Sequence, residues 1–170
     1  MSFQLLDVPV SRYTSSTIEA MHEMVKRAKT DPKFRELALF LSRDGDPGRD
    51  WKNYGAELEN VFSKLRKVVT YRRDPHQVEW VQSPWQTLRL GAGDCDDLSV
   101  LISSMMGALG APYRFITLKA DAARPEDWSH VFAEIKVPNS GWVGADLSVA
   151  DDLGFRPRGF AEKAWNEPTY

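Results

Sequence analysis

Apolar side chains recur at helical spacing through the first 70 residues and again in the middle of the chain. A repeat of about 3.6 residues marks one face of an amphipathic helix. The pattern predicts four helices, at residues 16–28, 31–41, about 51–70 and 95–109. His22 lies off the apolar face of the first of these helices, so we expect it in solvent.

The period changes from 3.6 to 2 after Gly110-Ala111-Pro112, a sequence typical of a helix end. The alternation then predicts three antiparallel strands, at residues 113–120, 129–137 and 142–149. Residues 3–10 are expected to form a short edge strand or an extended arm, because Pro9 cannot donate to a β-ladder. The tryptophan-rich segment 79–90 is expected to be irregular, since Pro84 bars a central strand.

Helices followed by a β-meander make an α+β layout. The sequence predicts a helical N-terminal half and a cysteine-bearing core helix packed on an antiparallel β-meander. A chain of 170 residues is long enough for one domain with a substantial core. We expect this single domain, 1–170, to comprise a helical part at about 14–70, a catalytic core at about 71–150 and a wrapping tail at 151–170.

Charge and cysteine content narrow the function classes. The net charge of −2 gives no electrostatic reason to expect nucleic acid or an anionic membrane as a partner. The single cysteine excludes an internal disulfide and favours a reducing compartment, so a cytoplasmic location is expected. Residues 44–50 resemble the start of a calcium loop, but Gly55 stands where that loop needs a glutamate, so we predict a turn. No cofactor is expected.

The only cysteine, Cys95, follows a glycine-rich loop and begins the fourth predicted helix. Helix N-termini carry unpaired N–H groups and a positive dipole end, which favour an anion such as a nucleophilic thiolate. Asp94, Asp96 and Asp97 suit a helix start, but their charges oppose a thiolate. A working thiolate would therefore need a cation, for which a histidinium is the natural candidate. The plainer interpretation of Cys95 is a small buried hydrophobe.

A histidine and an aspartate on the predicted meander can supply that cation. His130 lies eight residues before the turn centre at about Pro138, and Asp146 lies eight residues after it. This spacing predicts that the two face each other across the hairpin. An aspartate so placed can fix the histidine tautomer and stabilise the imidazolium. Packing of the Cys95 helix on the sheet would bring nucleophile, base and orienting carboxylate together.

These residues belong to a larger set of short motifs. In chain order they are Asp74-Pro75, Gln82-Ser83-Pro84 to Leu88, Gly91-Ala92-Gly93-Asp94-Cys95-Asp96-Asp97, Leu109-Gly110-Ala111-Pro112, Ser129-His130-Val131, and Gly141-Trp142-Val143 through Asp146. Through them the chain resembles the bacterial and phage branch of the transglutaminase-like superfamily, which has a papain-like catalytic core. The resemblance covers residues 68–149 well and the helical part upstream loosely.

The resemblance implies a Cys95–His130–Asp146 triad for acyl transfer. The thiolate would attack the carboxamide of a peptide or protein and form a thioester. An amine would then take the acyl group, as in a transglutaminase, or water would, as in a peptidase or amidase. The Cys95 backbone N–H would be one oxyanion donor, and Gln82 or Trp85 is a candidate for the second. The motif pattern is common in phage-encoded members, which implies a bacterial or phage-infected cell, with a virion as the alternative location.

Two other hypotheses stay open. The domain could be a catalytically idle structural or interaction domain of a phage or prophage protein, with segment 79–90 and the tail as contact surfaces. Alternatively, the acidic residues Asp94, Asp96 and Asp97 could bind a metal together with His130. Such a site would combine hard oxygen ligands with one nitrogen, and this spacing is not diagnostic of any metal.

Overall fold

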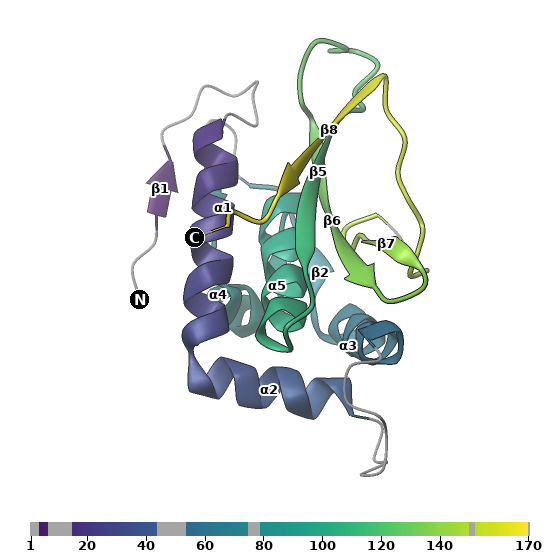
Figure 1. Cartoon of the computed structure of the whole chain (residues 1–170). Helices are drawn as coiled ribbons and strands as arrows, with labels where there is room; N and C mark the ends of the chain where they lie inside the picture. Colours follow the sequence, from purple (N-terminus) through teal and green to yellow (C-terminus); the bar gives the residue numbers. More distant parts are fainter. Residues whose placement is uncertain (1–3, 7–14, 44–53, 75–78, 150–151, 170) are drawn as a thin grey trace.

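The computed structural model describes residues 4–6, 15–43, 54–74, 79–149 and 152–169 (Figure 1). Its elements in chain order are β1 (Gln4–Leu6), α1 (Ser15–Thr30), α2 (Pro32–Ser42), α3 (Tyr54–Val68), β2 (Thr70–Tyr71), β3 (Glu79–Val81), α4 (Pro84–Leu90), β4 (Ala92–Gly93), α5 (Cys95–Ala108), β5 (Tyr113–Lys119), β6 (His130–Val137), β7 (Gly141–Ala145) and β8 (Ala161–Asn166). The mixed helical and antiparallel architecture confirms the predicted α+β class.

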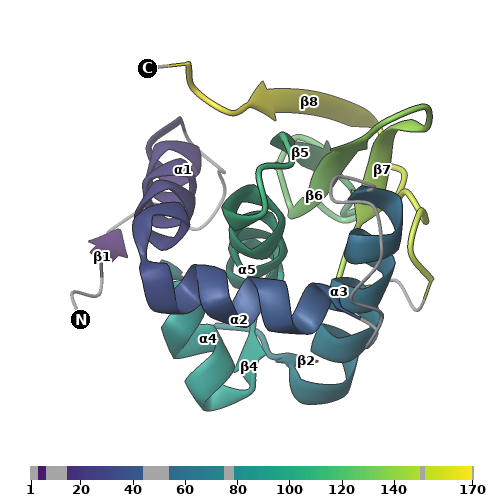
Figure 2. The same cartoon turned by 60° about the horizontal axis from the view of Figure 1, so that its bottom comes forward.

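Helix α5 is the centre of the molecule. Every residue from Cys95 to Ala108 is buried, including the acidic and serine side chains, so the helix lies inside the core rather than on its surface. Helices α1, α2, α3 and α4 contact α5 on its helical side, and strand β6 contacts it on the sheet side. Figure 2 shows α5 enclosed between these helices and the sheet. The position of Cys95 is therefore set by a helix that the whole core holds in place.

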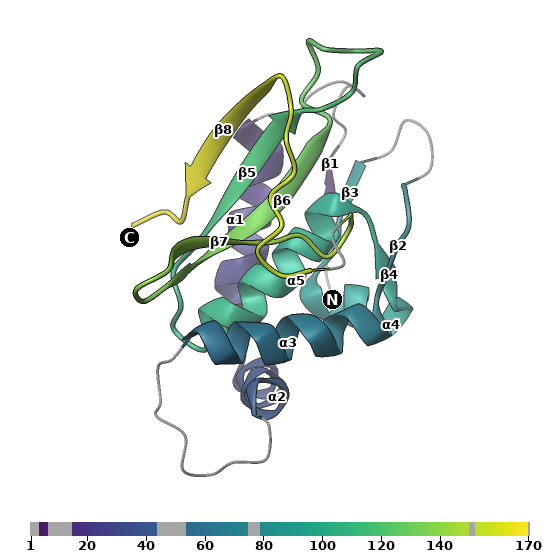
Figure 3. The ribbon, with the colours of Figure 1, turned by 90° about the vertical axis from the view of Figure 1, so that its right-hand side faces the viewer.

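The main sheet is antiparallel, with the strand order β7-β6-β5-β8. Val131, Ala133 and Ile135 on β6 belong to the same apolar core as α5. The opposite face carries a smaller cluster formed by Ile116, Leu118 and Phe132. The segment 152–160, which precedes β8, runs over this second face (Figure 3). It is bonded at both ends, because the Gly154 N–H donates to the Gly144 carbonyl and the Phe160 N–H donates to the Lys119 carbonyl.

The structure contains elements that the sequence did not predict, among them α4, β8 and the short strands β2, β3 and β4. Residues 84–90 form helix α4 rather than an irregular segment, because Ser83 caps the helix and Pro84 occupies its first turn. The tail also contributes strand β8, which pairs antiparallel with β5 from Arg114↔Asn166 to Lys119↔Ala161. The predicted turn at 44–50 lies outside the described residues.

The prediction that His22 is solvated is wrong. Its side chain is 6% exposed, and its Nδ1 lies 2.9 Å from the Tyr113 hydroxyl. The ring also packs against Phe115, with 4.9 Å between ring centroids. Burial lowers the pKa of His22 to about 4, so it is neutral at pH 7. A periodicity argument identifies one apolar face, but α1 is covered by both α5 and the sheet. Among the described residues, no helix has the length and apolarity needed to cross a membrane.

Candidate active site

The loop before Cys95 is shaped by two glycines. Gly91 ends α4 in the left-handed region, with φ of 63°, a conformation that glycine adopts without steric cost. Gly93 is required for a different reason, because a Cβ atom at this position would lie 2.6 Å from the Cβ of Asp97. The two glycines let the chain turn out of α4 and pass closely over the first turn of α5.

Helix α5 starts with a reciprocal cap. The Asp97 N–H donates to the Asp94 carboxylate, and the Asp94 N–H donates to the Asp97 carboxylate, both at 3.3 Å. Such a capping box satisfies backbone donors that have no intrahelical acceptor. Cys95 is the first residue of the helix and is 7% exposed. The acidic residues around Cys95 thus fix where the helix begins.

His130, at the start of β6, contacts the other two members of the predicted triad. Its Nε2 lies 2.7 Å from Oδ2 of Asp146, and its ring also forms a hydrogen bond with the Cys95 side chain. Because Nε2 faces Asp146, Nδ1 is the ring nitrogen left for the thiol. The side chains of His130 and Asp146 are 13% and 2% exposed. The structure therefore brings together all three residues named from the sequence.

The electrostatics of this group favour an imidazolium. Burial of His130 opposes its charged form. The hydrogen bonds to Asp146 and Cys95 and the negative charge of both partners outweigh burial, and they raise the pKa of His130 to about 10. Burial of Asp146 would likewise raise its pKa, but the bond to His130, the imidazolium charge and the bonds from Ser148 hold the pKa of Asp146 below its usual value. Each group stabilises the charged form of the other.

The strand register differs from the predicted one by two residues. The β6–β7 ladder ends at Ala133↔Ala145, so continuing the register places Asp146 opposite Phe132 rather than opposite His130. Asp146 reaches His130 diagonally from the residue just after β7. The predicted turn centre at Pro138 was one residue too early, which moves the pairing by two residues. Diagonal neighbours still lie within reach of an aspartate and a histidine.

Sequence reasoning missed a residue that anchors Asp146. The Ser148 hydroxyl and N–H donate to Oδ1 of Asp146 at 2.6 and 2.8 Å. This leaves Oδ2 for His130 and fixes the plane of the carboxylate. The signal was present in the sequence, because an aspartate often accepts a bond from the backbone two residues on, in an Asx-turn.

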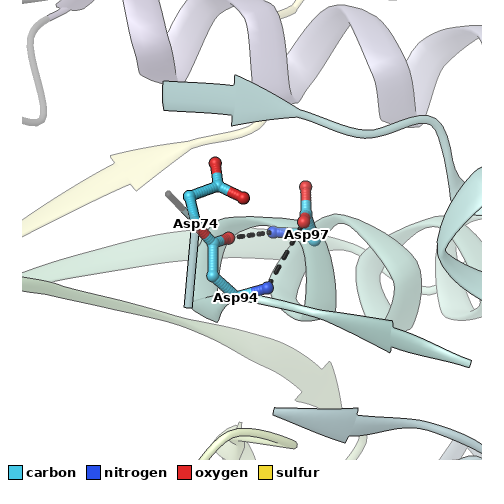
Figure 4. A group of neighbouring side chains, drawn as sticks. All are labelled: Asp74, Asp94 and Asp97. Atoms are coloured by element: carbon cyan, nitrogen blue, oxygen red, sulfur yellow. Dashed lines mark hydrogen bonds between the residues drawn. The ribbon is translucent and has the colours of Figure 1, made fainter. Parts of the chain in front are cut away.

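A second group of acids lies beside the triad. One carboxylate oxygen each from Asp74, Asp94 and Asp97 come within 4.8 Å of one another, and Figure 4 shows the three carboxylates gathered at the start of α5. Burial and the charge of Asp94 raise the pKa of Asp74 to about 6 and that of Asp97 to about 8. Three oxygens at this spacing are the kind of ligand set that a hard cation such as calcium uses.

Asp96 is the least solvated member of this region. It is 0% exposed, and neither carboxylate oxygen has a hydrogen-bond donor among the described residues. Burial and the charge of Asp94 raise the pKa of Asp96 well above its usual value, which favours its protonated form. The predicted metal set of Asp94, Asp96, Asp97 and His130 is not the group that forms in the described part of the chain. Asp74 takes part instead, and His130 is bonded to Asp146.

The two side chains predicted as oxyanion donors make other bonds in this structure. The single indole N–H of Trp85 donates to Asp31 at 2.8 Å. The Gln82 side-chain amide donates to Asp97 at 2.7 Å, and the Gln82 backbone N–H donates to the other oxygen of the same carboxylate. An oxyanion role for Trp85 would require its bond to Asp31 to break. Gln82 instead binds Asp97 at the start of α5, and Trp85 binds Asp31 at the start of α2.

Several solved structures share this fold. A candidate cysteine protease from Cytophaga hutchinsonii superposes with a TM-score of 0.53 at 20% identity, over 86% of this chain and 49% of its own. Legionella pneumophila LapG superposes with a TM-score of 0.50 at 19% identity, over 80% of this chain and 75% of its own. A candidate protease from Parabacteroides distasonis superposes with a TM-score of 0.50 at 15% identity, over 69% of this chain and 24% of its own. This chain thus spans about a quarter of the Parabacteroides protein and half of the Cytophaga protein.

Comparison with protein families finds the transglutaminase-like superfamily at residues 49–147. A search of curated proteins found no match. The family match includes Cys95, His130 and Asp146. It covers more than half of the 170 residues, and the solved structures agree with it in fold. The chain therefore belongs to the transglutaminase-like superfamily, a superfamily of thiol-dependent enzymes.

Proposed function

We propose that the protein is a thiol-dependent acyl-transfer enzyme, a cysteine peptidase, an amidase or a transglutaminase, with a Cys95–His130–Asp146 triad. One observation carries the proposal: His130 Nε2 lies 2.7 Å from Asp146 while the same ring bonds the Cys95 side chain at the start of α5. A thiol, an imidazole and a carboxylate in this order form a nucleophile, a proton carrier and an orienting group.

The first half-reaction forms a thioester. With a pKa of about 10, His130 holds its proton at neutral pH, and the resulting imidazolium favours a thiolate on Cys95. The Cys95 sulfur attacks the carbonyl carbon, and the carbonyl oxygen becomes an oxyanion. The Cys95 N–H, the first of α5, has no acceptor within the helix and can donate to this developing negative charge. When the carbon–nitrogen bond breaks, the His130 proton passes to the leaving amine.

The second half-reaction returns the enzyme to its starting state. His130, now neutral, takes a proton from water or from an amine as that molecule attacks the carbonyl carbon of the thioester. The carbon–sulfur bond then breaks, and Cys95 leaves as a thiolate beside the His130 imidazolium. Water gives hydrolysis and an amine gives transfer. Two of the structural neighbours are named as candidate proteases, which supports a peptide or protein as the acyl donor. A bacterial or phage-infected cell, in its cytoplasm, is the setting that the motif pattern favours.

The proposal is tested with p-nitrophenyl acetate, an activated ester that needs no matched substrate. We expect a burst of p-nitrophenolate and an acetyl group on the peptide that contains Cys95, detected by mass spectrometry. In this step the Sγ–carbon bond forms and the carbon–oxygen bond to p-nitrophenolate breaks. Casein with dansylcadaverine then separates the activities, since cleavage indicates a peptidase and dansyl incorporation indicates a transglutaminase.

Cys95→Ala is the control, because it removes the only thiol and leaves His130 and Asp146 in place. The variant should give neither burst nor acetylated peptide. A folded wild-type protein that shows no acetylation, or an alanine variant that matches wild type, would overturn the proposal. The first of those results would favour the alternative, a catalytically idle structural or interaction domain.

A further inference from the structure

We propose that the Tyr71 hydroxyl is the second oxyanion donor of the active site. This inference rests on the proposed acyl-transfer function and assigns the donor that the triad lacks. A tetrahedral intermediate on Cys95 carries a negative charge on oxygen. That charge forms beside Asp94, which directly precedes Cys95 in the sequence. An acidic setting opposes a new negative charge, so a donor in addition to the helix N–H groups is needed.

The backbone fixes Tyr71 next to the loop that carries Cys95. Strands β2 and β4 pair in parallel, and the register places Tyr71 opposite Gly93, two residues before Cys95. The ladder holds the chain on both sides of Tyr71, because the Thr70 N–H donates to the Gly91 carbonyl at 2.9 Å and the Arg72 N–H donates to the Gly93 carbonyl at 2.8 Å. Tyr71 therefore keeps its place relative to the start of α5.

The Tyr71 side chain has a free donor at the surface. It is 50% exposed, and within the described ranges its hydroxyl forms no hydrogen bond and no ion pair. The backbone position of Tyr71 is fixed. Its hydroxyl can therefore donate to a substrate without first breaking a hydrogen bond within the protein. Trp85 and Gln82 are different, since both donate to carboxylates.

The phenol interacts electrostatically with the groups at the start of α5. Burial raises the pKa of Tyr71, and the negative charges of Cys95, Asp94 and Asp96 raise it further against the opposing charge of Arg73. The Tyr71 hydroxyl therefore lies within the field of the thiolate and stays protonated at working pH. A protonated phenol can donate a hydrogen bond to an oxyanion and cannot compete with Cys95 as a base.

The test compares two reactions of Cys95 in wild type and Tyr71→Phe. Acetylation by p-nitrophenyl acetate passes through an oxyanion, whereas alkylation by iodoacetamide attacks a saturated carbon and forms none. Loss of one oxyanion donor lowers the rate by about 100-fold. We expect Tyr71→Phe to lose acetylation by about that factor and to keep its alkylation rate within twofold of wild type. Tyr54→Phe is the matched control, since Tyr54 begins α3 near Gly110, beyond the other end of α5.

Each result decides the inference. A Tyr71→Phe acetylation rate within threefold of wild type would overturn it. A parallel fall in acetylation and alkylation would also overturn it, because it would mean that Tyr71 acts on the thiol or on the fold. If wild type itself is not acetylated although its thiol alkylates, the proposed function fails, and this inference fails with it.

Discussion

At the scale of single residues, His130 links two groups that would otherwise be badly placed. Cys95 begins a helix among aspartates, and Asp146 is a buried carboxylate 2% exposed. A buried carboxylate is costly unless it is paired. The imidazolium pairs both, which is why the pKa of His130 rises to about 10 while that of Asp146 falls. We therefore propose that the imidazolium is present before substrate binds and that His130 acts first as an acid.

Ser148 tests how much of this arrangement depends on the orientation of Asp146. Ser148→Ala removes the 2.6 Å hydroxyl bond and keeps the backbone bond. One hydrogen bond is worth about 1 kcal/mol, so we expect acetylation of Cys95 to slow by about fivefold. The pH profile of Cys95 alkylation should also shift toward that of a free thiol, because a loosened Asp146 lowers the pKa of His130.

Ser140→Ala is the matched control for Ser148→Ala. Ser140 lies in the turn between β6 and β7, exposed to solvent. It should leave acetylation and the alkylation profile unchanged. Identical profiles for Ser148→Ala and wild type would contradict a positioning role for Ser148.

The sequence was enough to name three side chains that the structure brings together, but it did not reveal the groups that surround them. Cys95 is unique, and His130 and Asp146 lie at recognisable places on a hairpin. Asp74 could not be placed in the acidic group, because it reaches Asp94 and Asp97 only through the pairing of β2 with β4. Tyr71 was hidden for the same reason, since a two-residue strand has no pattern of its own.

At the scale of elements, the active site depends on how closely the loop before α5 passes over that helix. Gly93→Ala tests this contact, because the new Cβ would lie 2.6 Å from the Asp97 Cβ. Overpacking of this kind typically costs 1–3 kcal/mol, so we expect destabilisation by about 2 kcal/mol in chemical denaturation. The displaced cap should also slow Cys95 acetylation.

Gly141→Ala separates this clash from backbone strain alone. Gly141 has a φ of 75° and nothing within 4 Å of its would-be Cβ, so its replacement costs only left-handed strain of about 1 kcal/mol. It should leave the rate of acetylation unchanged. If Gly93→Ala acetylates at the wild-type rate, the loop does not position Cys95 in the way we describe.

The type of an element could be predicted where its apolar pattern was long. The prediction failed where the pattern was short. Helices α1, α2, α3 and α5 and strands β5, β6 and β7 follow the expected periodicity. Pro84 was interpreted as a strand breaker and is in fact the first residue of a helix. Strand β8 has five exposed residues of six, so alternation gave no signal, and its existence depends on pairing with β5.

At the scale of the whole molecule, the charged residues are unevenly distributed, although the net charge is only −2. Asp74, Asp94, Asp96 and Asp97 gather at one end of α5, and no ion pair joins them to a lysine or arginine among the residues that the structure describes. Burial raises the pKa of Asp97 to about 8 and that of Asp96 well above normal. The folded protein therefore holds extra protons here, and its stability depends on pH.

The sign of that dependence is opposite to ordinary acid denaturation. An aspartate with a raised pKa stabilises the fold fully below its unfolded pKa of about 4, and that stability is lost as pH rises through the folded value. Asp96→Asn removes one such ionisation. We expect the melting temperature of the variant minus that of wild type to increase between pH 5 and pH 9, measured with a chelator so that no cation replaces the protons.

Asp152→Asn, an exposed substitution in the tail, is the control for Asp96→Asn and should show a flat difference. His130 also loses stabilising charge as pH rises toward 10, but that loss is common to wild type and variant and cancels in the difference. A difference for Asp96→Asn that stays constant or decreases with pH would contradict the account of the acidic group.

An ion pair between Cys95 and His130 in the free enzyme can be tested by the rate of Cys95 alkylation by iodoacetamide from pH 4 to pH 10. The single cysteine makes the signal unambiguous. We expect wild type to reach its plateau well below ~8.5, the ordinary pKa of a thiol. His130→Ala, checked for folding by circular dichroism, should react only as pH approaches that value. A wild-type profile centred near ~8.5 and unchanged in the variant would contradict the ion pair and, with it, the proposed chemistry.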